Sequence, residues 1–192
     1  MGKLIFITGG ARSGKSKYAL KLAKNISRKV LFLATGTAKD EEMKKRIEEH
    51  KKSRPTYWET IEETKNIASA LLNIKSSYKV VIIDCLTFLI SNILLDGIDE
   101  KTILGEIKKI AEIILKADYT TIVISNEVGG GIVPDNELGR KFRDTAGLAN
   151  QIVAESAHQV YLVVSGIPIK IKPHNPPHLN PLPKGRGNNA LP

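Results

Sequence analysis

Apolar residues occur along the chain as short continuous runs, and these runs alternate with longer segments whose apolar positions recur every three or four residues. The continuous runs occupy residues 3–8, 29–35, 79–85, 120–127 and 159–166. Uninterrupted apolar runs of this length are typical of strands covered on both faces. Helical spacing occurs at 15–26, 40–52, 66–74, 86–95, 100–117 and 136–157. This alternation predicts an α/β fold in which helices cover both faces of a parallel sheet.

The pattern changes twice near the C-terminus. Residues 167–172 (IPIKIK) alternate apolar and polar positions, which predicts an edge strand antiparallel to the others. Residues 173–192 hold six of the nine prolines and have no periodic apolar face. Because such a segment cannot bury enough surface to offset its ordering entropy, we expect one folded domain over 1–172 and a disordered Pro-rich tail over 173–192. His174 and His178 lie in that tail without other strong metal ligands, so a metal site there is not favoured.

Composition narrows the class of protein. The 192 residues are 42% hydrophobic, which fits one domain with its own core. The net charge of +9 suits a phosphate-rich ligand, but it also fits a Lys-rich solvated surface. Aromatic residues make up only 5% and no long basic block occurs, so nucleic-acid binding is not favoured. Cys85 is the only cysteine and the apolar run at 3–8 is too short for a membrane span, so we expect a cytoplasmic protein without one.

Residues 8–18 (TGGARSGKSKY) carry the strongest chemical signal. Their core matches G-x-x-x-x-G-K-[ST] between a predicted strand and a predicted helix, where backbone N–H groups and the helix N-terminus can cradle phosphate. We expect Lys15 to reach the β- and γ-phosphates and the Ser16 hydroxyl to bind Mg²⁺. The motif predicts an α/β P-loop (RecA-like) three-layer fold with a mostly parallel sheet. The predicted phosphate-binding residues are Gly9, Gly10, Ala11, Arg12, Ser13, Gly14, Lys15 and Ser16.

Two carboxylates follow apolar strands. Asp84 ends VVIID in the Walker B pattern, which makes it the second predicted Mg²⁺ ligand, although a strand-terminal capping role is the plainer alternative. Glu127 ends another strand and precedes three glycines, 129–131, which indicate a mobile loop or a close approach of the backbone to a ligand. Glu127 is a candidate for positioning a nucleophile or Mg²⁺, and the sequence does not distinguish these roles.

The charged helix predicted at 40–52 carries a histidine in an unusual place. Met43, Ile47 and His50 follow one another at i, i+4 and i+7, so they share a face. A lone histidine on such a face is more often packed than catalytic. The other histidine of the predicted domain, His158, lies between a helix and a strand without a partner motif.

Further segments extend these motifs into a longer pattern. They are GGARSGKS (9–16), LATGTAKDEEMKKRIEEHKKSRPTYWETIE (33–62), IIDCLTFLISNILL (82–95), SNEVGGGIVPDNELGRKFRDTAGLANQIVA (125–154) and VYLVVSGIPIKIK (160–172). In this order and spacing they resemble the bifunctional adenosylcobinamide kinase/adenosylcobinamide-phosphate guanylyltransferases. The resemblance covers residues 3–172. It implies an enzyme that phosphorylates adenosylcobinamide and then transfers GMP from GTP through a guanylylated histidine, giving adenosylcobinamide-GDP.

The resemblance also assigns roles to residues. His50 falls on the guanylylated histidine, Glu62 on the carboxylate that reads guanine, and Asp84 on the Walker B position. Further contacts to the guanine nucleotide are implied for Ala34, Thr35, Gly36, Lys51, Lys52, Ser53 and Arg54. The predicted catalytic residues are therefore His50, Lys15, Asp84 and Glu127. The resemblance further implies GTP, ATP and Mg²⁺ as cofactors, a corrinoid substrate and a homotrimer.

Several points stay open at this stage. A P-loop kinase without guanylyl transfer and a RecA-like nucleic-acid-binding ATPase remain alternatives. One GTP must offer its γ-phosphate to the kinase step and its α-phosphate to His50, so we expect the helix at 40–52 to move about hinges at 35–37 and 53–55. Arg140, Arg143 and Asp144 can meet the corrinoid phosphate, a neighbouring subunit, or only solvent.

Overall fold

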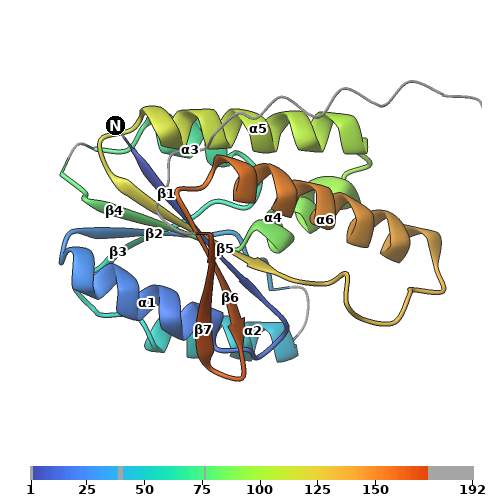
Figure 1. Ribbon diagram of the computed structural model, residues 1–192, viewed down its shortest axis with the longest axis horizontal. Helices are drawn as coiled ribbons and strands as arrows, with labels where there is room; N and C mark the ends of the chain where they lie inside the picture. Colours follow the sequence, from blue (N-terminus) through green and yellow to red (C-terminus); the bar gives the residue numbers. More distant parts are fainter. Residues whose placement is uncertain (1, 39–40, 76, 173–192) are drawn as a thin grey trace, which may run out of the picture.

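In a computed structural model, the protein folds into a seven-stranded sheet with helices on both faces (Figure 1). The structure describes residues 2–38, 41–75 and 77–172, so the predicted tail at 173–192 lies outside the described residues. The strands are β1 (Lys3–Gly9), β2 (Val30–Ala34), β3 (Glu59–Glu62), β4 (Val80–Asp84), β5 (Thr120–Asn126), β6 (Gln159–Val164) and β7 (Ile167–Lys172). Their order is β3-β2-β4-β5-β1-β6-β7. Among the described strands, only β6 and β7 pair antiparallel, which confirms the predicted mostly parallel sheet with an antiparallel edge strand.

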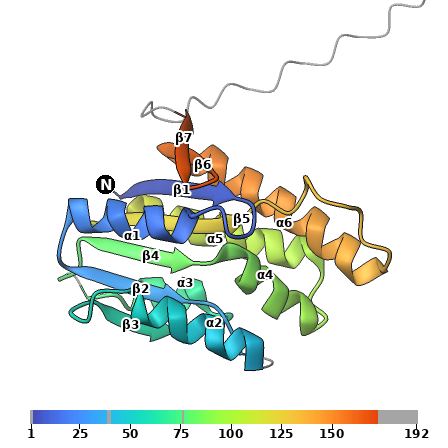
Figure 2. The same cartoon turned by 90° about the horizontal axis from the view of Figure 1, so that it is seen from below.

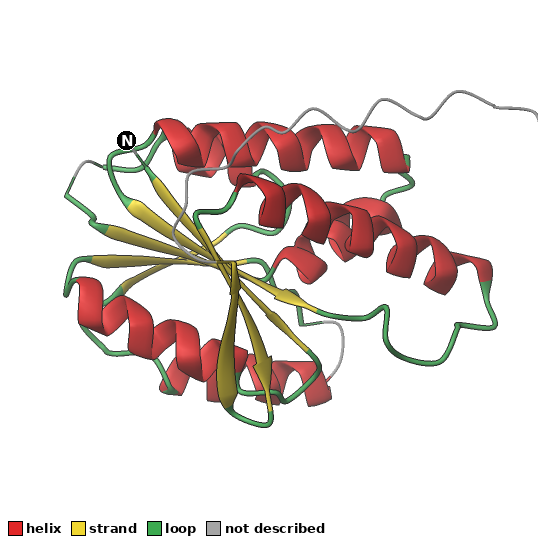
Figure 3. Ribbon diagram, viewed as in Figure 1, coloured by secondary structure: helices red, strands yellow, loops and turns green. Residues whose placement is uncertain are grey.

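The helices follow the predicted alternation closely. They are α1 (Lys15–Ile26), α2 (Glu41–Lys52), α3 (Ile67–Leu72), α4 (Leu86–Leu95), α5 (Glu100–Lys116) and α6 (Glu137–Ser156). Figure 3 shows α1 and α2 on one face of the sheet and the remaining helices on the other. Within the described part of the chain, no helix combines the length and apolar character that crossing a membrane requires.

Strand β3 is an element that the sequence did not predict. Its four residues, ETIE, are all exposed, so no apolar run marks them. The strand forms because its backbone pairs in parallel with β2, from Leu31 opposite Glu59 to Ala34 opposite Glu62. It lies at the edge opposite β7 (Figure 2). This edge position explains why β3 can be polar on both faces.

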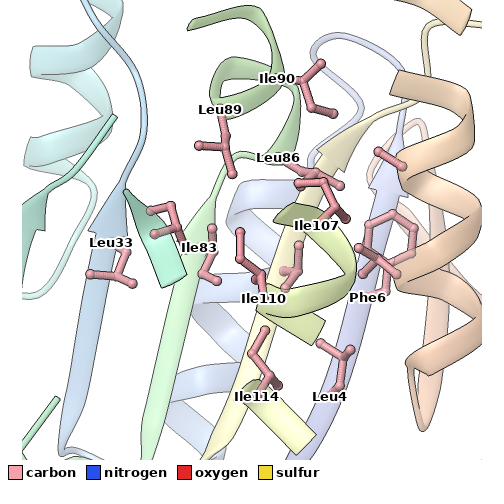
Figure 4. Packing of buried hydrophobic residues seen from close by; sticks show 14 of the residues in the cluster. Leu4, Phe6, Leu33, Ile83, Leu86, Leu89, Ile90, Ile107, Ile110 and Ile114 are labelled. Atoms are coloured by element: carbon pink, nitrogen blue, oxygen red, sulfur yellow. The ribbon is translucent and has the colours of Figure 1, made fainter. Parts of the chain in front are cut away.

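The continuous apolar runs reflect burial on both faces of the sheet. In β1, Leu4 and Phe6 pack toward α5 and α6, whereas Ile5 and Ile7 pack toward α1. Figure 4 shows Leu4 and Phe6 with Ile107 and Ile110 of α5 in the larger of these clusters. Because successive strand side chains point to opposite faces, a strand with two covered faces needs an apolar residue at every position.

The parallel strands end along one edge, where their chemistry gathers. Gly9 of β1 lies opposite Asn126 of β5, and Ala34 of β2 lies opposite Asp84 of β4. Strand β5 separates β1 from β4, so the P-loop after β1 and the carboxylate that ends β4 are two strands apart. Loops from several strand ends therefore face one another across this edge, as is typical of open α/β sheets.

Candidate active site

The P-loop occupies the turn between β1 and α1, and its lysine faces back into the loop. Lys15 is 8% exposed, and its Nζ donates a 2.9 Å hydrogen bond to the carbonyl oxygen of Gly10. Burial lowers the pKa of Lys15, while the neighbouring Cys85 and Asp84 act in the opposite direction. The helix begins after Gly14, which has a left-handed backbone (φ 94°). Gly14 has no side chain that could cap the first N–H groups of α1. Such groups are suited to binding phosphate oxygens.

The turn between β6 and β7 supports this loop, which the sequence analysis did not foresee. Gly166 lies against Gly14, so closely that a Cβ on Gly14 would be 3.1 Å from the Gly166 Cα. A Cβ on Gly9 would be 2.4 Å from the carbonyl oxygen of Val163 at the end of β6. The Ser165–Gly166 pair indicates a turn, but a pattern of local residues cannot reveal which loop that turn contacts.

Asp84 is the group on which the site converges. Its half-buried carboxyl ends β4 and takes a hydrogen bond from the side chain of Ser16. Burial raises the pKa of this carboxyl above its ordinary value of 3.8, and nearby His50, the Ser16 bond, Arg54 and Lys15 oppose that rise. The two predicted Mg²⁺ ligands are thus close enough for the Ser16 hydroxyl to lower the pKa of Asp84. A hydroxyl and a carboxylate beside a phosphate cradle are oxygen ligands that suit Mg²⁺.

Thr35, at the end of β2, holds the backbone that follows Asp84. Its hydroxyl donates a 2.7 Å hydrogen bond to the carbonyl oxygen of Cys85 and accepts one of 2.7 Å from the Cys85 amide. The next residue, Gly36, faces Ile47 of α2: a Cβ there would be 3.7 Å from the Ile47 Cδ1. The predicted contact loop at 34–36 therefore joins β2, the Walker B segment and α2.

His50 lies in the last turn of α2 with its side chain exposed. Met43 and Ile47 on the same helix are half-buried, so the shared face does turn toward the protein, but His50 itself is not packed in the core. It is close enough to Asp84 to lower that carboxyl's pKa. The Ser53 hydroxyl donates a 2.8 Å hydrogen bond to the His50 carbonyl and closes the end of the helix. The exposed imidazole argues against the packed interpretation.

A cleft of about 390 Å³ lies between the end of α2 and β3, and its lining begins at Lys51, the residue after His50. Lys51 forms an ion pair with Glu62 across it, and the Arg54 guanidinium lies over the Phe32 ring at 3.7 Å. Its lining residues are Lys51, Lys52, Arg54, Pro55, Thr56, Trp58, Thr60 and Glu62. The cleft therefore brings the predicted guanine-reading carboxylate next to the predicted basic contacts. Trp58 and Thr60 were not predicted from the sequence; the available signal was a lone tryptophan four residues before Glu62.

Glu127 and the arginines of α6 make local contacts. The Glu127 carboxylate is exposed and accepts a 2.9 Å hydrogen bond from the Gly129 amide, while the Glu127 amide bonds the Gly9 carbonyl. Arg140 donates to the carbonyls of Pro134 and Asp135, and Arg143 pairs with Asp144. Glu127 thus lies at the entrance of the P-loop, whereas the contacts of the arginines are with their own loop and helix.

His158 has a structural role that fits its isolated position in the sequence. Its Nδ1 accepts a 3.1 Å hydrogen bond from the Leu4 amide, and its own amide donates to the Leu4 carbonyl at 2.8 Å. The imidazole is therefore bound to strand β1 rather than turned toward the cleft.

The protein is a P-loop nucleotide-binding protein of RecA-like fold. This class is defined by the P-loop after β1, the carboxylate that ends β4, and the strand β5 between them. The fold agrees with the crystal structure of the RadB recombinase, which aligns with a TM-score of 0.52 and 15% identity over 84% of this chain and 74% of that chain. Residues 5–171 match the family described as cobinamide kinase/cobinamide phosphate guanyltransferase, and the chain belongs to this family. The predicted fold, family and bifunctional enzyme class are confirmed.

Relatives agree with this membership along nearly their whole lengths. The chain is 39% identical to the bifunctional adenosylcobalamin biosynthesis protein CobU of Escherichia coli, over 88% of this chain and 99% of that protein. The CobU of Salmonella typhimurium is 38% identical over the same shares. The bifunctional adenosylcobalamin biosynthesis protein CobP of Pseudomonas aeruginosa is 39% identical over 86% of this chain and 95% of that protein.

Proposed function

We propose that this protein phosphorylates adenosylcobinamide and then joins GMP to the new phosphate through a covalent intermediate on His50. The observation that carries the proposal is the convergence of His50, Lys15 and Ser16 on Asp84, next to the cleft that holds Glu62. The P-loop favours binding of a nucleoside triphosphate. An exposed imidazole beside the P-loop is suited to nucleophilic attack on that nucleotide.

In the kinase step, the hydroxyl of the corrinoid's aminopropanol group attacks the γ-phosphorus of a nucleoside triphosphate held by the P-loop. A P–O bond forms to the corrinoid, the bond to the β-phosphate breaks, and the hydroxyl proton is released. Lys15, which exchanges its bond to Gly10 for phosphate oxygens, neutralises the negative charge that develops. ATP and GTP are both proposed donors, since this step does not require that the base be read.

In the guanylyl transfer, a neutral His50 nitrogen attacks the α-phosphorus of GTP. An N–P bond forms, the bond to the β-phosphate breaks, and pyrophosphate leaves. An oxygen of adenosylcobinamide phosphate then attacks the same phosphorus, the N–P bond breaks, and adenosylcobinamide-GDP results. Lys51, Lys52 and Arg54 line the cleft on the side of His50 and stabilise the phosphates. Glu62 accepts hydrogen bonds from guanine N1–H and its exocyclic amine.

Mg²⁺ fits the oxygen ligands at the end of β4. Ser16 and Asp84 would hold it together with nucleotide phosphate oxygens, and when bound it supplies charge neutralisation at those oxygens. Glu127, at the entrance of the P-loop, is proposed to orient the attacking group.

The two steps need different distances between His50 and the nucleotide, so we propose that α2 moves between them. Residues 35–37 connect β2 to this helix, and residues 53–55 follow it. A Cβ on Gly36 would be 3.7 Å from the Ile47 Cδ1, so the glycine keeps this connection free of a side chain against α2. Equal proteolysis rates at both connections with and without GTP would speak against this motion.

A labelling experiment tests the covalent step. The protein is incubated with Mg²⁺ and GTP labelled on the α-phosphate, denatured, and digested to locate the label. We expect an acid-labile GMP adduct on His50 that is absent with ATP and absent in His50→Ala. His158→Gln is the matched control, because it changes the other described histidine, which is bound to β1, and should keep the adduct. A GTP-binding protein without any adduct would reduce the function to a P-loop kinase or ATPase.

Two further features belong to the proposal. The protein works in the cytoplasm, where nucleoside triphosphates are available.

It assembles as a homotrimer, for which the exposed isoleucines of β7 provide a contact surface: Ile167, Ile169 and Ile171 are 65%, 48% and 57% exposed. Exposed apolar residues gathered on an edge strand are typical of association surfaces.

A further inference from the structure

Asn92, a buried residue of α4, bridges two loops at the edge of the cleft. Its side-chain amide donates one hydrogen bond of 2.9 Å to the carbonyl oxygen of Thr35 and another of 3.1 Å to that of Thr64. The residue is 6% exposed. One carboxamide therefore satisfies backbone acceptors from the ends of two different strands, β2 and β3.

One bridged loop leads from β2 to α2 and the other follows β3, and the cleft is lined by the end of α2 and by β3. Thr35 begins the segment that leads into α2, and a Cβ on Gly36 would be 3.7 Å from the Ile47 Cδ1 of that helix. Thr64 follows Glu62 by two residues and continues from β3. A second contact reinforces the Thr64 side, since Lys65 forms an ion pair with Asp96 just beyond α4.

Strand β3 needs such support more than the other strands do. It has four residues, all exposed, and its ladder runs to β2 alone. Glu62 lies at its last position, so the side chain depends on how the chain continues beyond the ladder. Asn92 anchors that continuation to α4, and α4 begins directly after the Asp84–Cys85 segment. The ladder places Glu62 opposite Ala34 and Ala34 opposite Asp84, and Asn92 adds a tie between the chain that follows Glu62 and the helix that follows Asp84.

We propose that Asn92 is a positioning residue for guanine recognition: it fixes Glu62 and the start of α2 relative to Asp84, and thereby sets the preference of the cleft for GTP over ATP. The inference rests on the proposed function, because Glu62 is taken as the carboxylate that reads guanine. The Asn92 amide is already bonded to the carbonyls of Thr35 and Thr64, so its proposed role is indirect. It acts on binding of the base rather than on phosphate chemistry.

The test compares Asn92→Leu and Asn92→Ala with Asn150→Leu. Asn150 is a matched control: it is 7% exposed, lies on α6, and donates its amide to the Asn126 carbonyl, away from β2 and β3. Dissociation constants for GTP and ATP are measured together with the KM and maximal rate of His50 labelling. We expect the ratio of the ATP dissociation constant to the GTP dissociation constant to be roughly tenfold lower in the Asn92 variants than in the wild type. We expect the KM for GTP to rise while ATP affinity and the labelling rate at saturating GTP stay near wild type.

A double-mutant cycle separates this role from a loss of stability. If Asn92 acts through Glu62, adding Asn92→Leu to Glu62→Gln produces little further loss of GTP preference, because the two changes are coupled. Additive losses, or an equal loss of preference in Asn150→Leu, overturn the inference. Unchanged preference in both Asn92 variants overturns it as well, while the wild-type adduct on His50 keeps the proposed function standing. A wild type that shows neither adduct nor preference removes the proposed function itself.

Discussion

The backbone amide of Gly166 donates a 2.8 Å hydrogen bond to the carbonyl oxygen of Ser13, so the turn between β6 and β7 holds the middle of the P-loop. Gly14 follows Ser13 and lies against the same turn. The last hairpin of the described chain is therefore part of the phosphate site, although it is far from the motif in sequence. Changes at this contact should affect stability and nucleotide binding together.

Gly14→Ala tests that contact. The backbone of Gly14 is left-handed, with φ 94°, and the added methyl would lie 3.1 Å from the Gly166 Cα. A left-handed conformation costs a residue with a Cβ about 1–2 kcal/mol. We expect a loss of unfolding free energy of at least this size, together with weaker ATP and GTP binding, measured by urea unfolding and by titration.

Gly105→Ala is the matched control for this change. Gly105 lies within α5, and a Cβ there would have no atom within 4 Å. Because alanine is the better helix residue, this variant should gain about 0.5–1 kcal/mol and bind nucleotide as the wild type does. A Gly14→Ala protein as stable as the wild type would contradict the role assigned to the Gly166 turn.

The P-loop and the strand–helix alternation could be predicted because each depends on local sequence. Strand β1 needs an apolar residue at every position, and the G-x-x-x-x-G-K-[ST] motif needs only neighbours in the chain. Strand β3 could not be predicted, because its stability comes from backbone pairing with β2 and leaves no side-chain pattern.

Part of the candidate site could be predicted because it depends on local sequence, and the rest could not because it depends on long-range packing. His50 could be placed on a face with Ile47 by helical spacing, but its approach to Asp84 depends on how α2 packs against the sheet. The bridge from Asn92 to Thr35 and Thr64 joins residues that are 57 and 28 positions away in the chain. Such long-range contacts leave no local signal, and single residues such as Trp58 gain meaning only once the cleft is seen.

Glu62→Gln should weaken the preference for GTP. The carboxamide keeps one acceptor oxygen but turns an N–H₂ group toward a base that itself donates, and it removes the ion pair with Lys51. We expect the ratio of the dissociation constants of ATP and GTP to fall by about tenfold or more. Glu59→Gln, at the start of the same strand and bonded to Tyr78, is the control. Equal effects of both changes would exclude base reading by Glu62.

Asp84→Asn should stabilise the protein in the absence of nucleotide. Burial raises the pKa of the Asp84 carboxyl above 3.8, so the charged form is disfavoured in the folded state. The contribution of the Asp84 carboxyl to the free energy of unfolding is complete below its unfolded-state pKa. This contribution is lost as the pH rises through its folded-state pKa. The melting temperature of Asp84→Asn relative to the wild type should therefore increase as the pH rises above about 4.

We expect Mg²⁺ and nucleotide to raise the melting temperature of the wild type but not that of Asp84→Asn, because one of the two proposed ligands is gone. Asp118→Asn removes an exposed carboxylate and controls for the loss of one negative charge. A variant that melts below the wild type at neutral pH without ligand would show that attraction to Lys15, Arg54 and His50 outweighs the burial of Asp84.

The exposed isoleucines of β7 should govern assembly. Ile169 and Ile171 are 48% and 57% exposed and alternate with Lys170, so they lie on one face of the edge strand. Placing a lysine at both positions adds charges that cannot be buried without partners. We expect sedimentation to give a trimer for the wild type and a smaller species for Ile169→Lys/Ile171→Lys. Leu72→Lys, which alters a 68% exposed leucine on α3, should leave the trimer intact. A trimeric double variant would place the contact between copies on another surface.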